Sequence, residues 1–149
     1  MESDALDPRS ALDEIESGRG GVSLRLGSPW WFHAGLGVLV AQQALVSGLA
    51  GGNWSVPSFV ALVAGSAALV ALARQSTGVT VARPRGPRSR GLMAARILAA
   101  LACIWGSALV DSTVIVVLIA AAALGATTLL GIAYDIALRH DTAEGAVGP

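Results

Sequence analysis

The sequence predicts an all-α membrane protein with four transmembrane helices, arranged as two antiparallel hairpins with both the N and C termini in the cytoplasm. Two observations favour this fold class. The chain of 149 residues is 54% hydrophobic and only 13% charged, whereas a soluble domain carries about 25% charged residues. In addition, no charged side chain occurs between Arg25 and Arg74. An uncharged stretch of that length is suited to lipid and not to a surface in water.

Four runs of the sequence are long enough to cross a bilayer. A bilayer core is about 30 Å thick and needs about 20 apolar residues in a spanning helix. The runs that qualify are residues 31–49, 56–73, 92–110 and 113–138. Four helices that are apolar all round would leave nothing polar to cover them in a soluble protein of this size. They therefore predict a four-helix transmembrane domain, a membrane four-helix bundle, over residues 30–138.

The connections between these runs set the orientation. Residues 50–55 join the first pair of spans and residues 111–112 the second, and loops this short make neighbouring helices antiparallel. The central loop 74–91 contains no acidic residue and five arginines, which are Arg74, Arg83, Arg85, Arg88 and Arg90. Short Arg-rich loops stay on the cytoplasmic side. We therefore expect a multi-pass protein of the cell (inner) membrane with this loop and both termini inside.

The same five arginines are expected to contact anionic lipid headgroups of the bilayer. This interaction and the topology account for the basic loop, so no nucleic-acid partner is predicted. Residues 1–29 predict a cytosolic segment with a short helix at Pro8–Ser17, capped by Asp7. Its acidic start argues against a cleaved signal peptide, which begins with basic residues. Residues 139–149 are typical of a disordered cytoplasmic tail.

Small residues recur every four positions in the last two spans. In lipid, such stripes let helix backbones approach closely, and we expect these two to face each other. The third span carries Ala95, Ala99, Cys103 and Ser107, and the fourth carries Ala123, Thr127 and Gly131, leading to Asp135. Cys103, the single cysteine, is interpreted as part of this packing.

Two charged residues within the spans are the main candidates for function, because charges there are costly and usually functional. Arg96 and Asp135 lie at similar predicted depth near the cytoplasmic side. Three interpretations stay open. The first has Arg96 reach the headgroups and Asp135 the interfacial water; the second pairs them between helices; the third makes them part of a substrate or ion site.

Two further residues lie at the same predicted level. His33, Arg96, Tyr134 and Asp135 are thus a candidate polar cluster at the cytoplasmic mouth, although an interfacial histidine beside two tryptophans is the simpler interpretation of His33. Gln42 and Gln43 are candidates for polar contacts in mid-membrane, where a glutamine usually bonds between helices. Because successive helical residues lie about 100° apart, the two are not expected to share a neighbour.

The motifs of common enzymes and metal sites do not occur in the sequence. There is no His-Glu-x-x-His, paired cysteine, P-loop or Gly-x-Ser-x-Gly pattern, so no catalytic, cofactor or metal residue is predicted. The favoured function is an accessory or assembly subunit that acts through another membrane protein or as a homo-oligomer. The alternative is a minimal homodimeric transporter or channel for a small solute. A membrane enzyme is the third choice and would need His33 and Asp135 within reach of each other.

Three short motifs carry a resemblance to a known family. They are Ala-Leu-Asp-Glu-Ile-Glu at residues 11–16, Pro-Trp-Trp-Phe-His at 29–33 and Ala-Arg-Gln-Ser-Thr-Gly-Val-Thr-Val at 73–81. With them the chain resembles a family of small four-helix actinobacterial membrane proteins of unknown function, which implies this topology and no catalytic residues. It is also similar in topology to small multidrug transporters. Those depend on an acidic residue in the first span, and residues 31–49 contain none.

Overall fold

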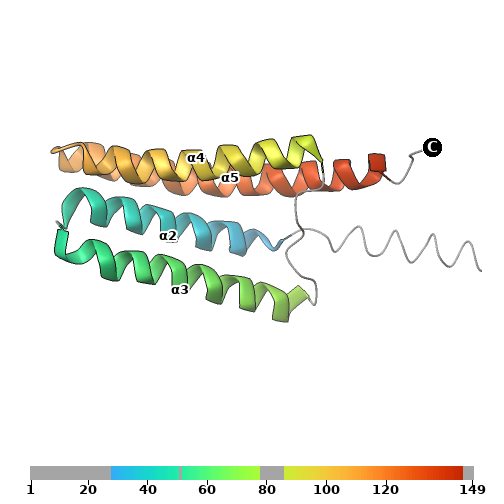
Figure 1. Cartoon of the computed structure of the whole chain (residues 1–149), viewed down its shortest axis with the longest axis horizontal. Coiled ribbons are helices and arrows are strands. Elements are labelled where there is room, and N and C mark those ends of the chain that lie inside the picture. Colours follow the sequence, from blue (N-terminus) through green and yellow to red (C-terminus); the bar gives the residue numbers. More distant parts are fainter. Residues whose placement is uncertain (1–27, 51, 78–85, 146–149) are drawn as a thin grey trace, which may run out of the picture.

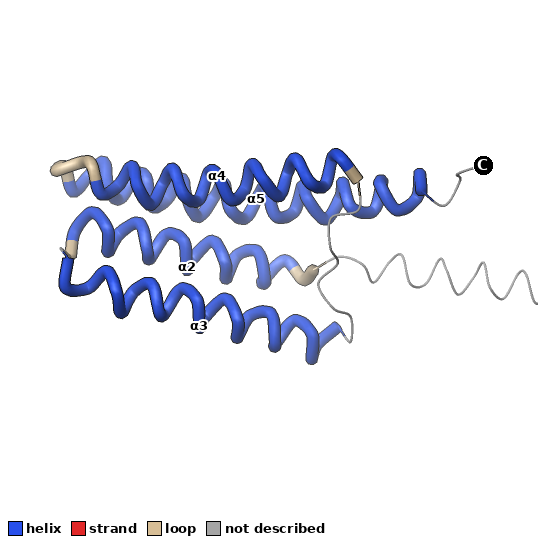
Figure 2. The backbone as a smooth tube through the Cα atoms, in the orientation of Figure 1, coloured by secondary structure: helices blue, strands red, loops and turns tan. Residues whose placement is uncertain are grey.

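The computed structural model describes residues 28–50, 52–77 and 86–145. They form four helices, α2 (Trp30–Leu49), α3 (Gly52–Thr77), α4 (Pro87–Ala108) and α5 (Thr113–Gly145). The helices lie side by side along one long axis (Figure 1). The α2–α3 and α4–α5 connections lie at one end of the bundle (Figure 2). The predicted helix at Pro8–Ser17 lies outside the described residues.

Each of the four helices is long and apolar enough to cross a membrane. The candidate spans are Trp30–Leu49, Gly52–Thr77, Pro87–Ala108 and Thr113–Asp141. The shortest, α2, has 20 residues, which corresponds to about 30 Å of helix, the thickness of a bilayer core. The prediction of an all-α protein with four candidate membrane-spanning helices is therefore confirmed, and these spans define a multi-pass membrane protein.

The segment between the second and third spans is more helical than predicted. We expected a loop over residues 74–91, but α3 continues to Thr77 and α4 already begins at Pro87. Proline is well suited to a first helical position, because its missing N–H needs no partner there. As a result Arg74, Arg88 and Arg90 lie on helices, while Arg83 and Arg85 lie outside the described residues.

The prediction of a disordered tail at residues 139–149 is wrong for its first part, since α5 continues through Gly145. The reason is a contact with the start of α4. The carboxylate of Asp141 accepts a hydrogen bond of 3.1 Å from the backbone N–H of Ser89, which lies in the first turn of α4. N–H groups there lack partners within the helix, and the helix dipole favours a negative charge beside them.

Helix α2 is at the centre of the packing. Its most extensive contact is with α5, and it also packs against α3 and α4, while α4 packs mainly on α5. Small residues permit these approaches. A Cβ added at Gly37 would lie 2.9 Å from the carbonyl oxygen of Leu124, and one at Gly48 would lie 2.9 Å from the carbonyl oxygen of Ser107. The bundle is thus held by α2 as well as by the α4–α5 contact.

The small-residue stripes of the third and fourth spans, which we expected to face each other, do so only in part. On α5, Ala123, Thr127 and Gly131 are all buried. On α4, Ser107 is buried, Cys103 is half-buried and Ala95 is exposed. The cause is α2, which shares the α5 stripe with α4: the His33 side chain from α2 covers Gly131.

Candidate functional site

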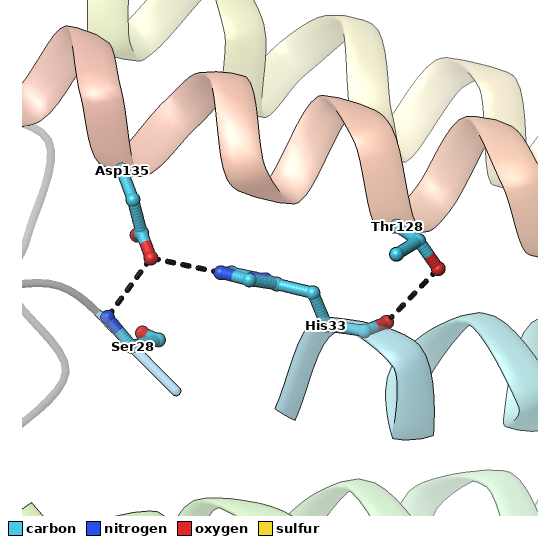
Figure 3. A network of polar contacts seen from close by, with 4 residues as sticks. All are labelled: Ser28, His33, Thr128 and Asp135. Atoms are coloured by element: carbon cyan, nitrogen blue, oxygen red, sulfur yellow. Dashed lines mark hydrogen bonds and ion pairs between the residues drawn. The ribbon is translucent and has the colours of Figure 1, made fainter. Parts of the chain in front are cut away.

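A buried hydrogen bond links the first turn of α2 to α5. The Nε2 atom of His33 lies 2.8 Å from Oδ2 of Asp135, and the two side chains are 2% and 11% exposed. Figure 3 shows the imidazole pointing from α2 toward the carboxylate on α5. His33 is held in this direction because α2 begins at Trp30, directly after Pro29, whose carbonyl accepts a 2.9 Å bond from the Phe32 N–H.

The same carboxylate oxygen also binds the chain just before α2. The backbone N–H of Ser28 donates a 2.9 Å hydrogen bond to Oδ2 of Asp135 (Figure 3). Hydrogen bonds to a charged acceptor are about twice as strong as neutral ones. Asp135 therefore fixes both the entry of the chain into α2 and the orientation of the His33 ring.

Arg96 of α4 also approaches Gly131, next to the His33 ring. A Cβ added at Gly131 would meet the His33 ring, and it would lie 3.1 Å from the guanidinium carbon of Arg96. The absence of a side chain at Gly131 thus leaves room for both groups. No ion pair between Arg96 and Asp135 occurs within the described part of the chain, although their charges interact over a longer distance.

Two nitrogen atoms near Gly131 have no hydrogen-bond partner among the described residues. They are Nδ1 of His33 and Nη2 of Arg96, both of them buried. An ionised Asp135 only accepts hydrogen bonds, so it places the His33 proton on Nε2 and leaves Nδ1 as an acceptor. The acceptor Nδ1 of His33 and the cationic donor Nη2 of Arg96 therefore lie near each other without a direct bond. A bound polar group could form hydrogen bonds with both.

A cavity adjoins this cluster between α2, α4 and α5. Its volume is about 240 Å³, and it is partly open. Arg96, Thr127 and Tyr134 provide its polar lining, and the apolar lining includes Leu36 and Val40 of α2. Of the predicted cluster, the structure thus brings His33 and Asp135 into contact, and it places Arg96 and Tyr134 at the adjoining cavity.

The two mid-span glutamines form a separate network with α3. Gln42 Nε2 donates a 2.8 Å hydrogen bond to the Ser58 hydroxyl, and that hydroxyl donates a 2.6 Å bond to Gln43 Oε1. The expectation that neighbouring glutamines cannot share a partner is wrong, because a hydroxyl can accept from one side chain and donate to the other. The Oε1 atom of Gln42 is buried and has no hydrogen-bond partner among the described residues.

Sequence reasoning missed Ser28 and Ser58. Ser28 acts through its backbone N–H, for which a sequence carries no signal. Ser58 could have been found by matching depths on either side of the short α2–α3 connection, since it stands about as far from that connection as Gln43 does. No group of three or more His, Cys, Asp or Glu side chains suited to a metal ion occurs among the described residues.

The fold and the cluster define the protein as a multi-pass membrane protein with buried ionisable side chains. No protein-family model, no curated protein and no solved structure matches the chain. The resemblance to the small actinobacterial membrane family stays a prediction.

Proposed function

We propose that this protein is a carrier for a small solute, the second of the functions that the sequence leaves open. The observation that supports this most is the buried pair of His33 and Asp135, 2.8 Å apart. Ionisable side chains inside transmembrane bundles are costly, and they mark substrate pathways and proton relays. An accessory subunit acts through its outer surface and gives no reason to place such a pair inside.

The pair also offers a means of linking protonation to movement. Oδ2 of Asp135 holds both His33 and the backbone at Ser28. A proton on Nδ1 of His33 gives the imidazole a positive charge, which strengthens its bond to Asp135 and the contact between the start of α2 and α5. A proton can thereby shift the balance between a closed and an open arrangement at this end of the bundle.

The proposal includes a cell (inner) membrane location, two antiparallel hairpins, and both termini in the cytoplasm. What supports this orientation is the distribution of charge. Arg74, Arg88 and Arg90 lie on helix ends that gather at one end of the bundle (Figure 1), while Asp111 lies in the α4–α5 connection at the other. Arginines near span ends stay on the cytoplasmic side.

A homodimer is also proposed, because the cavity beside Arg96 is partly open in one chain and a second copy would cover it.

Orientation is tested by labelling single cysteines in intact cells. In a C103A background, S112C should react with a membrane-impermeant maleimide and H140C should react only after lysis. The reverse pattern would overturn the proposed orientation.

The carrier function is tested with the full chain reconstituted in liposomes. Uptake of radiolabelled lactate, alanine and glucose, which represent an anion, a zwitterion and a neutral solute, is measured with and without an inward proton gradient. We expect the gradient to accelerate at least one of the three and D135N to abolish that acceleration. The matched control is D111N, which neutralises an exposed acid in the α4–α5 connection and should leave uptake unchanged.

Two results would contradict the carrier proposal. One is uptake that is unaffected by D135N and H33Q. The other is a lack of protein-dependent uptake for all three solutes together with recovery of a second membrane protein when the tagged chain is purified in mild detergent. The latter would favour the accessory function.

A further inference from the structure

The cavity between α2, α4 and α5 combines an apolar wall with a few polar groups at one side. Leu36, Val40, Met93 and Ile97 contribute to its apolar lining. The polar groups are Arg96, Thr127 and Tyr134. Binding sites for small molecules have this composition, in which apolar walls provide affinity and a few polar groups fix orientation.

The hydroxyl of Thr127 lacks the bond that its neighbour makes. A helical threonine usually bonds the carbonyl four residues earlier, and Thr128 does so, with 2.8 Å between its Oγ1 and the Leu124 oxygen. Thr127 is only 3% exposed and its Oγ1 is buried with no partner among the described residues. Since Thr127 lines the cavity, its hydroxyl is a donor left available for a ligand there.

Arg96 provides the second available donor. Its Nη2 atom is buried without a partner in the described part of the chain. A cation in apolar surroundings is stabilised strongly by a hydrogen-bonded anion, and the planar guanidinium fork matches a carboxylate. A monoanion leaves one negative charge to be neutralised at this site, whereas a dianion such as phosphate leaves two, so a monoanion is favoured.

From these observations we infer that the cavity binds the carboxylate of a small acid with an apolar body, with Arg96 and the Thr127 hydroxyl as donors and one proton taken up by His33. The volume of about 240 Å³ lies below the range of about 300–1,000 Å³ that is typical of pockets for drug-sized ligands, so the enclosed part of the ligand is small. The inference rests on the proposed carrier function and names its substrate class. Because the cavity is partly open, the carboxylate can come from a short free acid or from a fatty acid of the bilayer.

The proton follows from charge balance. The titratable and charged groups around His33 are Asp135 and Tyr134 of α5 and Arg96 of α4. On α3, the apolar residue Leu69 lies against Gly35, two residues after His33. With Asp135 ionised and His33 neutral, the charges of these two groups and Arg96 sum to zero. A carboxylate then brings the sum to −1, and a net buried charge is costly. One proton on Nδ1 of His33 restores neutrality.

The test measures binding by isothermal titration calorimetry on the full chain in detergent, with butyrate as the short acid and palmitate as the fatty acid. Titrations in two buffers of different ionisation enthalpy give the number of protons taken up. We expect saturable binding of butyrate, palmitate or both, with about one proton per carboxylate. Butyramide, which has nearly the same shape and no charge, should not bind.

The matched variants are T127V and T128V. Loss of the Thr127 hydroxyl should weaken carboxylate binding by about tenfold or more, the usual effect of a hydrogen bond to a charged group. T128V should bind as the unmodified chain does, since the Thr128 hydroxyl donates to the backbone carbonyls of Leu124 and, at 3.5 Å, of His33 and does not line the cavity. R96Q should abolish binding, and H33Q should abolish the uptake of a proton.

Binding of butyramide as tight as that of butyrate, equal effects of T127V and T128V, or binding without proton uptake would overturn the inference. Failure of the carrier function gives a different result. Carboxylate binding in detergent with no solute uptake in liposomes would support this binding site and contradict the carrier function. Uptake of glucose or alanine without binding of either carboxylate would overturn the site and leave the carrier function standing.

Discussion

The imidazole of His33 on α2 packs directly on Gly131 of α5, so that a Cβ at position 131 would lie 2.8 Å from the ring carbon Cγ. The guanidinium of Arg96 approaches the same glycine from α4. Three helices thus bring their polar groups together over one residue that has no side chain. The site depends on this close approach as much as on the charged residues themselves.

We expect G131A to destabilise the protein by about 1–3 kcal/mol, the usual effect of overpacking, because the added methyl group displaces the His33 ring from Asp135. The measurement is unfolding of the detergent-solubilised protein, followed by circular dichroism. The control is G125A on the same helix, where a Cβ meets no atom of the described residues within 4 Å. It should be neutral or stabilising, since alanine favours a helix over glycine; equal losses in both variants would contradict this account.

Two glycines of α2 allow a second comparison. At Gly37 an added Cβ would lie 2.9 Å from a backbone oxygen of α5, whereas at Gly35 it would meet only the methyl groups of the Leu69 side chain on α3, also at 2.9 Å. A leucine side chain can move aside and a helix backbone cannot. We therefore expect G37A to destabilise the bundle and G35A to have a clearly smaller effect, measured by the same unfolding experiment. Equal effects would mean that α2 and α5 can move apart without a loss of stability.

Much of the fold could be predicted because the bilayer imposes it. A helix must satisfy its own backbone within lipid and must be about 20 residues long, so four long apolar runs sufficed to find α2, α3, α4 and α5. The ends of the helices were harder to predict. The extension of α5 depends on the bond between Asp141 and the Ser89 N–H, a contact between residues 52 positions apart that no local pattern contains.

The sequence predicted the depth of the candidate site in the membrane but not which of its residues are in contact. Counting residues from the span ends placed His33, Arg96 and Asp135 at one depth. Which pair meets depends on the rotation of each helix about its axis, and that is set by close approaches such as Gly37 on Leu124 and Gly131 under His33. The bond from the Ser28 N–H to Asp135 could not be predicted because its donor is a backbone N–H, which every residue except proline carries.

The network of Gln42, Ser58 and Gln43 should hold α3 against α2. S58A removes two interhelical hydrogen bonds at once, and bonds of this kind in membrane proteins contribute about 0.6 kcal/mol each and at most about 1.7 kcal/mol. We expect a loss of about 1–2 kcal/mol in unfolding free energy on that basis. The control is S66A on the same helix, since Ser66 has no hydrogen bond from its side chain in the described part of the chain. A loss in S66A as large as that in S58A would contradict a specific role of the network.

The contact between Asp141 and Ser89 should protect the first turn of α4. Loss of a helix-capping carboxylate costs about 1 kcal/mol, so D141A should raise the population of an open first turn by on the order of fivefold. Arg88 and Arg90 are exposed in that turn, and trypsin cleaves after arginine only where the backbone is open, so the cleavage rate in detergent reports the opening. D141N keeps an acceptor without the charge and should give an intermediate rate. H140A changes an exposed neighbour and should leave the rate unaltered, whereas the same acceleration in H140A would show that the end of α5, and not the carboxylate of Asp141, protects α4.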